Sequence, residues 1–178
     1  VTLTNDNELS RLNFISFTPS TSFDLKSNLG NKDERVLLFA MLREAWNLTT
    51  AASLNVFQGW AGTDSFRNAV TFFLNNGRVH EGIAADFVKA VRKATTLRRE
   101  FEDLCSHFHR ADARISDEVR IRRNTFIGEL RALLARVCLK SLQPDLIILD
   151  AFQRAKDLLD GESEARQLAH DLLEYSDA

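Results

Sequence analysis

The sequence has few residues that interrupt helices and few that form disulfides or bind metals. Its 178 residues include 2 prolines, Pro19 and Pro144, so the stretch between them lacks the strongest helix breaker. The 2 cysteines, Cys105 and Cys138, lie far apart, which excludes a disulfide framework and a paired-cysteine zinc motif. Long helices and a reducing, intracellular setting are therefore expected.

Long apolar runs and a strong charge of either sign are also missing. No run approaches the roughly 18 apolar residues of a membrane span. The segment Val1–Asp6 lacks the basic and then apolar order of a signal peptide. The net charge is −2, from 23 basic and 25 acidic residues, so a nucleic-acid partner would need a local basic patch. We expect no membrane partner.

Hydrophobic residues make up 44% of the chain, which is enough for a sizeable core without help from metals. The sequence predicts an all-α fold, namely a helical bundle with two long central helices and an extended N-terminal arm. A single domain is expected over residues 1–178. It would comprise an arm over 1–32, a bundle core over 33–140 and C-terminal helices over 144–178.

The first half of the chain predicts short elements. Residues 1–30 are rich in Ser, Thr and Asn with scattered aromatics, which favours an extended arm or a short strand. Asn31–Glu34 carries a capping signal that begins a first helix running to about Trp46. A short second helix is expected from Thr49 to about Trp60, where a turn cluster ends it. Residues 64–74 fit a helix and a short strand equally well.

The second half predicts long helices. Apolar residues recur every three or four positions from Ile83 to about Phe108, which is typical of one long amphipathic helix. Ser116 is a suitable N-cap for the next helix, which should run to about Lys140. Pro144 is expected to start a further helix through Leu159, and residues 162–175 a last one.

The sequence gives little support for a metal site or a catalytic site. Cys105, His107 and His109 lie near Asp103 and Asp112, and these are ligand types that zinc accepts. On a helix, however, position 107 points away from 105 and 109, and no second cluster adds a ligand. The sequence also lacks a nucleophile elbow, a phosphate-cradling glycine loop and a helical His-Glu-x-x-His. We expect no metal site, no cofactor and no enzyme, and a protein that works by binding and assembly.

The arginines are unevenly distributed. Nine basic residues fall between positions 92 and 123, and six interleaved acids leave a local excess of about three positive charges. If the two long helices are antiparallel, these cations share one end of the bundle. The pattern fits a salt-bridged, solvated helix face or a phosphate-binding patch. Arginine favours the second because its guanidinium contacts phosphate with two donors. The basic residues are Arg92, Lys93, Arg98, Arg99, Arg110, Arg114, Arg120, Arg122 and Arg123.

The order of these elements resembles the coat proteins of rod-shaped plant RNA viruses, the tobamovirus-like group. The layout is similar over residues 30–140. Phe57-Gln58-Gly59-Trp60 is similar to the family's Phe-x-x-x-Trp element after the second helix. Leu97–Glu100 is similar to its Arg-Asn-Arg stretch, and Ala113–Glu118 to its Arg-Arg-Val-Asp-Asp-Ala helix start.

The resemblance implies a structural, RNA-binding capsid protein that polymerises into a helical rod around single-stranded genomic RNA, in the virion and the host cytoplasm. Its partners would be RNA and identical subunits. Carboxylates crowded between subunits would favour assembly at lower pH. The implied RNA-binding residues are Arg98, Arg99, Arg110, Arg114, Asp117, Arg122 and Arg123, and the implied assembly carboxylates are Glu100, Glu102, Asp103 and Glu118.

Two other classes fit the same composition. One is a small helical subunit of another nucleoprotein complex, such as a CRISPR surveillance complex. The other is a protein–protein adaptor that uses the apolar and acidic C-terminal region without nucleic acid.

Overall fold

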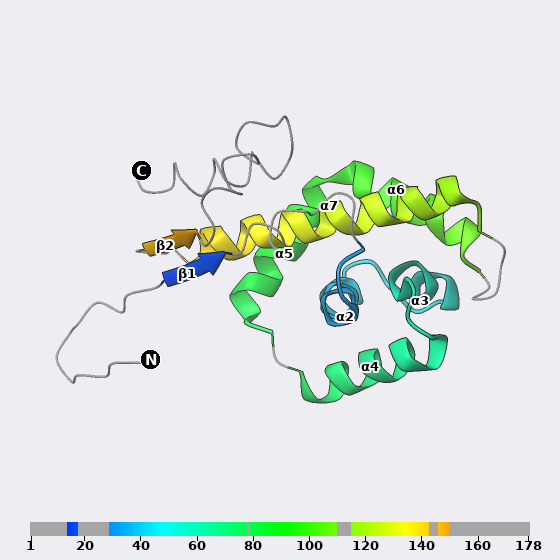
Figure 1. Ribbon diagram of the computed structural model, residues 1–178, viewed down its shortest axis with the longest axis horizontal. Helices are drawn as coiled ribbons and strands as arrows, with labels where there is room; N and C mark the ends of the chain where they lie inside the picture. Colours follow the sequence, from blue (N-terminus) through cyan, green and yellow to red (C-terminus); the bar gives the residue numbers. More distant parts are fainter. Residues whose placement is uncertain (1–13, 18–28, 78, 110–114, 143–145, 150–178) are drawn as a thin grey trace. The chain divides into compact units, whose positions relative to one another are not determined.

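The computed structural model describes residues 14–17, 29–77, 79–109, 115–142 and 146–149. By its internal contacts the chain divides into two compact units (Figure 1). Residues 24–141 form the helical unit, and residues 1–23 with 142–178 form the terminal unit. A single domain over residues 1–178 stays a prediction.

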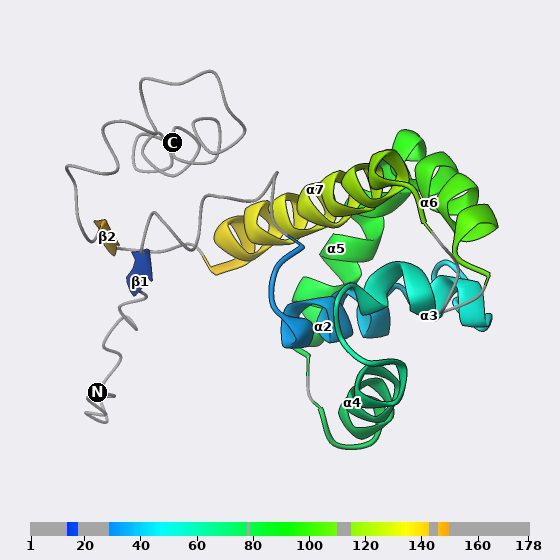
Figure 2. The same cartoon turned by 45° about the vertical axis from the view of Figure 1, so that its right-hand side comes forward.

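The helical unit confirms the expected helical fold class. Its described residues form helices from near the start of the unit to its end, connected by short turns (Figures 1 and 2). The helices are α2 (Lys32–Leu42), α3 (Ala51–Gln58), α4 (Thr63–Asn76), α5 (Glu81–Lys93), α6 (Thr95–His107) and α7 (Asp117–Leu142).

Local capping explains where several of these helices begin. The Asn31 side chain accepts a hydrogen bond from the Glu34 N–H at 2.9 Å, and the Glu34 carboxylate accepts one from the Asn31 N–H at 3.0 Å. This reciprocal capping box fixes the start of α2. Ser116 Oγ likewise accepts from the Val119 N–H at 3.3 Å at the start of α7. Both predicted helix starts are confirmed.

The long helix predicted over 83–108 is wrong, because the structure divides this stretch in two. α5 ends at Lys93 and α6 begins at Thr95, and Ala94 between them has φ −84° and ψ 70°, outside the helical region. Thr95 and Thr96 are β-branched and have low helix propensity, which favours a break at this point. The break still leaves Val91 and Leu97 buried, so the apolar spacing runs through both helices.

The ambiguous stretch over 64–74 is helical. It lies within α4, where Phe66 and Val70 are buried four residues apart and form the apolar face. Helical spacing places such residues one above the other.

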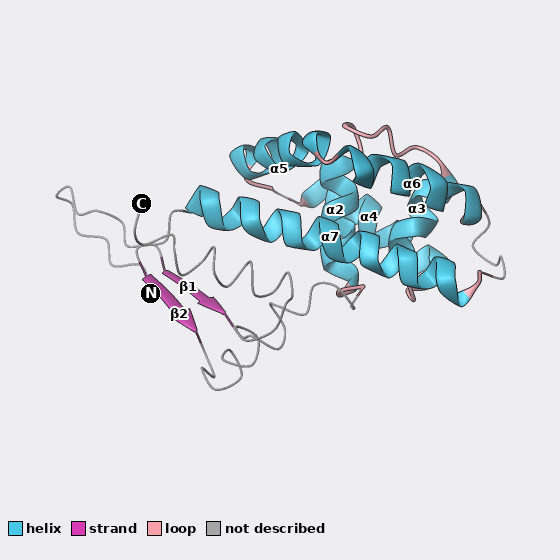
Figure 3. Cartoon of the chain, turned by 90° about the horizontal axis from the view of Figure 1, so that it is seen from above, coloured by secondary structure: helices cyan, strands magenta, loops and turns pink. Residues whose placement is uncertain are grey.

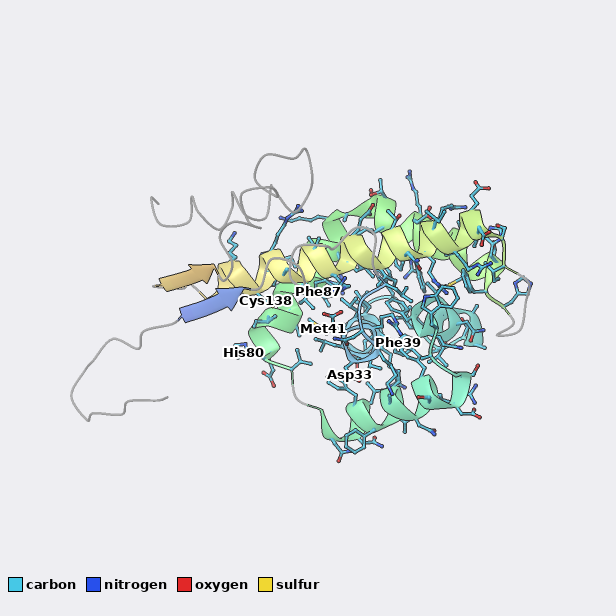
Figure 4. The ribbon with its side chains drawn as sticks, in the orientation of Figure 1. Asp33, Phe39, Met41, His80, Phe87 and Cys138 are labelled. Carbon is cyan, nitrogen blue, oxygen red and sulfur yellow. The ribbon has the colours of Figure 1, made fainter. Side chains whose placement is uncertain are left out.

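Aromatic side chains connect four helices in the core. Phe57 of α3 lies with its ring centroid 5.6 Å from that of Phe39 of α2, and 6.1 Å from those of Phe101 of α6 and Phe126 of α7. Tilted and edge-on geometries of this kind are the favoured arrangements of aromatic pairs. Figure 4 labels Phe39 among the side chains of this region. Phe57 is therefore the residue at which these helices meet.

α6 and α7 run antiparallel beside each other (Figure 3). Arg123 of α7 lies 5.5 Å from the ring of Phe108, at the end of α6, whereas Phe126, further along α7, lies 5.9 Å from Phe101. Later residues of α7 thus contact earlier residues of α6, as expected for antiparallel helices. The end of α6 and the beginning of α7 therefore share one end of the helical unit.

The terminal unit contains a pair of short strands, drawn in magenta in Figure 3. β1 (Phe14–Phe17) pairs in parallel with β2 (Leu146–Leu149), with Phe14 opposite Leu146 and Phe17 opposite Leu149. β1 lies within residues 1–30, for which the sequence favoured an extended arm or a short strand, and the arm over 1–32 stays a prediction.

The C-terminal helices predicted over 144–178 need a correction. The helix expected from Pro144 to Leu159 is wrong over 146–149, where the chain forms β2. Leu146-Ile147-Ile148-Leu149 is a short, continuous apolar run that periodicity cannot assign, and its isoleucines favour a strand. The rest of this helix and the one predicted over 162–175 lie outside the described residues.

Candidate nucleic-acid interface

The structure gives the predicted RNA-binding arginines very different surroundings. Arg98 on α6 donates from Nε to Glu102 Oε1 at 2.6 Å and from Nη1 to the Trp46 carbonyl at 3.0 Å. Its guanidinium also lies 5.5 Å from the centroid of the Trp46 ring. Arg98 therefore ties α6 to the core, and its charge is already paired within the chain.

Arg122 on α7 is bound even more completely. Its Nε and Nη2 donate to the two Glu100 oxygens at 3.0 and 2.9 Å, and Nη2 also donates to Asp103 Oδ2 at 2.6 Å. Hydrogen bonds from Glu100 and Asp103 raise the pKa of this guanidinium above its ordinary value. This cluster holds α6 against α7, and three of the five guanidinium N–H donors serve the two carboxylates.

Arg123 is buried, with 4% of its surface exposed. Its hydrogen bonds go to the neutral side-chain oxygen of Asn124, at 3.3 and 3.1 Å, and no carboxylate among the described residues pairs with it. Burial, together with the neighbouring charges of Arg35 and Arg120, lowers the pKa of Arg123 to about 10. Arg123 is therefore a buried cation with other cations beside it and no carboxylate partner among the described residues.

Asp117 and the remaining predicted arginines differ in their surroundings. Asp117 Oδ1 lies 2.7 Å from Arg120 Nη2, so this carboxylate pairs with an arginine. Arg110 and Arg114 lie outside the described residues. Arg99 on α6 is exposed, and it forms no ion pair or hydrogen bond with any described residue.

Arg99 belongs to a run of cations with the same character. We call these the basic segment, which spans the junction of α5 and α6 and consists of Lys89, Arg92, Lys93 and Arg99. All four side chains are exposed, and within the described part of the chain none has an acidic partner. The nearby acids Glu100 and Glu102 are already bound to Arg122 and Arg98.

Three of the four predicted assembly carboxylates are paired within the chain. Glu100 and Asp103 hold Arg122, and Glu102 holds Arg98. Glu118 is exposed and has no ion-pair partner among the residues that the structure describes. A hollow of about 430 Å³ lies beside Glu118, between the end of α6 and the start of α7. Its lining residues are His107, Ile115, Ser116, Glu118, Val119 and Arg122.

Sequence reasoning missed an exposed tryptophan beside the arginines of α7. Trp60 follows α3 and is 71% exposed. The guanidiniums of Arg120 and Arg123 lie 5.9 and 5.7 Å from its ring centroid. We call Trp60, Arg120 and Arg123 the Trp60 platform. The signals in the sequence were a tryptophan in the glycine-bounded turn Gly59–Gly62 and two arginines three residues apart on one helix.

Two features fix the position of Trp60. Arg35 is buried and donates to the carbonyls of Phe57 at 2.9 Å and Gln58 at 3.2 Å, the last two residues of α3. The next residue, Gly59, has φ +64°, and a Cβ there would collide with the Leu29 side chain. Only glycine fits that conformation at no cost. The turn that carries Trp60 is therefore held in one conformation by these contacts.

The described residues form no metal site and contain no activated thiol. No group of three or more His, Cys, Asp or Glu side chains there is placed to hold a metal ion. His107 Nε2 lies 3.8 Å from Asp103 Oδ2, and burial raises the pKa of the Cys105 thiol to about 11, so the thiol stays protonated at neutral pH. None of the helices that the structure describes is long and apolar enough to cross a bilayer.

Comparisons with known proteins give no relative from which to transfer a function. No protein-family model matches the chain, and neither curated proteins nor solved structures give a significant match. A function must therefore be argued from the chemistry of this surface.

Proposed function

We propose that this chain is a structural subunit that binds single-stranded RNA and polymerises with identical copies along it, as the coat protein of a rod-shaped RNA virus does. The observation that carries the proposal is the basic segment, whose four cations are exposed and have no acidic partners among the described residues. The resemblance of the element order to that coat-protein group adds to it. Such a subunit would work in the virion and the host cytoplasm.

Unpaired cations are what phosphate binding requires. An arginine that already holds a carboxylate must break that pair before it can contact RNA, whereas an exposed free cation only releases counterions from the RNA. Four such residues lie between positions 89 and 99, at the end of α5 and the beginning of α6. Such cations suit the phosphate backbone of RNA, which they would bind without regard to base sequence.

Affinity per subunit would be modest, and polymerisation would multiply it. Each subunit neutralises a few phosphates, and neighbours on the same strand bind as one multivalent ligand. Exposed apolar side chains support subunit contacts, because Ile121 is 65% and Leu74 is 39% exposed. Covering such side chains between subunits would remove apolar surface from water.

The test compares the salt dependence of RNA binding between two matched double variants. Arg92→Ala with Arg99→Ala removes two unpaired cations of the basic segment, and Arg43→Ala with Arg67→Ala removes two exposed arginines elsewhere. Fluorescence anisotropy of a labelled oligouridylate gives the affinity at several salt concentrations. The first variant should lower the slope of log affinity against log salt by about 1.4, at about 0.7 for each lost single-strand contact.

The control variant should leave the slope unchanged. Equal slopes for both variants, or no binding by the unmodified protein at low salt, would contradict the proposal. RNA binding by particles that stay monodisperse would favour a subunit of another nucleoprotein complex over a coat protein.

A further inference from the structure

We propose that the Trp60 platform is a stacking site for one nucleobase of single-stranded RNA, with the adjacent phosphate held by Arg120. This inference rests on the proposed function for the identity of the ligand, but it uses different residues. The basic segment lies on α5 and α6, whereas the platform consists of the turn after α3 and the first turns of α7.

The exposure of Trp60 is the first observation. Phe57, three residues earlier, is fully buried, yet the larger indole of Trp60 is 71% exposed on a turn that Arg35 and Gly59 hold in place. A rigid, exposed aromatic ring is the element on which single-stranded nucleic acids stack, because every base offers a flat face.

The charge beside the ring is the second observation. Arg120 and Arg123 reach the same indole from positions three apart on α7. The described residues offer Arg120 a single, exposed carboxylate, Asp117, and offer Arg123 none. An anion beside Arg120 would supply the missing negative charge, and the guanidinium fork is suited to phosphate.

An unused donor gives the third observation. The Nε–H of Arg120 is buried and has no hydrogen-bond partner among the described residues. Buried donors are almost always satisfied in folded proteins, so an unsatisfied one suggests a ligand or a rearrangement on binding. A base on the indole with its own phosphate at Arg120 uses both the ring and the cation. An acidic peptide would use the cations alone.

The experiment separates stacking from charge. Binding of a labelled oligoadenylate and of inorganic polyphosphate is measured for Trp60→Ala and for Phe72→Ala. The second variant removes an aromatic side chain of similar exposure that has none of the described arginines against its ring. Trp60→Ala should weaken oligoadenylate binding about tenfold and leave polyphosphate binding unchanged. Phe72→Ala should change neither.

A spectroscopic readout gives an independent check. Oligoadenylate should quench part of the tryptophan fluorescence of the unmodified protein, and Trp60→Phe should abolish that quenching while retaining most of the affinity, since Trp46 is buried. Circular dichroism of each variant verifies that the helices persist.

The outcomes distinguish the two proposals. Equal oligoadenylate affinity for Trp60→Ala and the unmodified protein would overturn the stacking site and leave the basic segment standing. Equal loss of oligoadenylate and polyphosphate binding would also overturn it, because the ring would then only position the arginines. Absence of RNA binding by the unmodified protein would remove the proposed function itself.

Discussion

The Nε–H of buried Arg35 donates to the main-chain carbonyl of Phe57 at 2.9 Å, so the first turn of α2 closes the last turn of α3. The guanidinium also donates to the carbonyls of Gln58 at 3.2 Å and Gly30 at 2.6 Å. Carbonyls at a helix C-terminus carry the negative end of the helix dipole, which stabilises a cation there. One buried charge thus organises the turn that carries Trp60.

Removing Arg35 should destabilise the helical unit strongly. Arg35→Met leaves these buried carbonyls without donors, and we expect a loss of about 3 kcal/mol in the free energy of unfolding. Urea denaturation followed by circular dichroism measures this loss. Arg43→Met, at an exposed position just after α2, should change the midpoint little. Similar midpoints for the two variants would show that the buried hydrogen bonds contribute nothing net.

Gly59 should be far less tolerant of substitution than Gly62. Alanine at Gly59 meets a left-handed φ of +64° and the Leu29 side chain, whereas Gly62 has φ −60° and open space around its Cβ position. We expect Gly59→Ala to cost about 2 kcal/mol of stability and Gly62→Ala well under 1. Thermal melting of the two variants compares them directly, and equal melting temperatures would rule out strain at Gly59.

The helix boundaries show what a sequence of this kind can predict. The starts of α2 and α7 were readable because capping by Asn31, Glu34 and Ser116 is a local pattern. The helix break at Ala94 could not be predicted from the apolar spacing, because this spacing continues unchanged through α5 and α6. Strand β2 was missed because a run of four apolar residues has no period to measure.

The candidate site was less predictable, since it depends on tertiary contacts. The pairing of Arg98 with Glu102 is a helical spacing of four and could be anticipated. The binding of Arg122 to Glu100 joins residues 22 positions apart, and the burial of Arg123 depends on the packing of Phe108 and Trp60. The distribution of arginines in the sequence indicated the region of the candidate interface. It could not show which of these arginines pair with carboxylates in the folded chain and which have no such partner among the described residues.

The difference between arginines with and without carboxylate partners predicts different effects of single substitutions. Arg99→Ala should lower the salt slope of RNA binding by about 0.7, because an unpaired cation is lost. Arg122→Ala should leave the slope nearly unchanged, since its guanidinium already holds Glu100 and Asp103. Anisotropy titrations at several salt concentrations measure both slopes. A larger effect for Arg122 than for Arg99 would mean that RNA displaces the carboxylates.

Cys105 should make stability depend on pH in the alkaline range. Burial raises the pKa of its thiol from 9.0 to about 11 in the folded protein. The unfolded chain therefore releases this proton first, so the contribution is complete below pH 9 and disappears as pH rises through 11.

A half-buried thiol should give a loss of about 1 kcal/mol over that window. Urea denaturation of the unmodified protein and of Cys105→Ala at both ends of the window isolates the effect. An identical pH dependence for the two proteins would contradict it.

Negative-stain electron microscopy of the purified protein, with and without single-stranded RNA, tests most directly whether this chain is a coat-like subunit. Crowded carboxylates between subunits bind protons on assembly, so assemblies should be larger at about pH 5.5 than at about pH 8. Glu118, which has no ion-pair partner among the described residues, is the first candidate for such crowding. We predict rods with RNA whose length follows the length of the RNA. Monodisperse particles of single-subunit size in every condition would contradict the proposal.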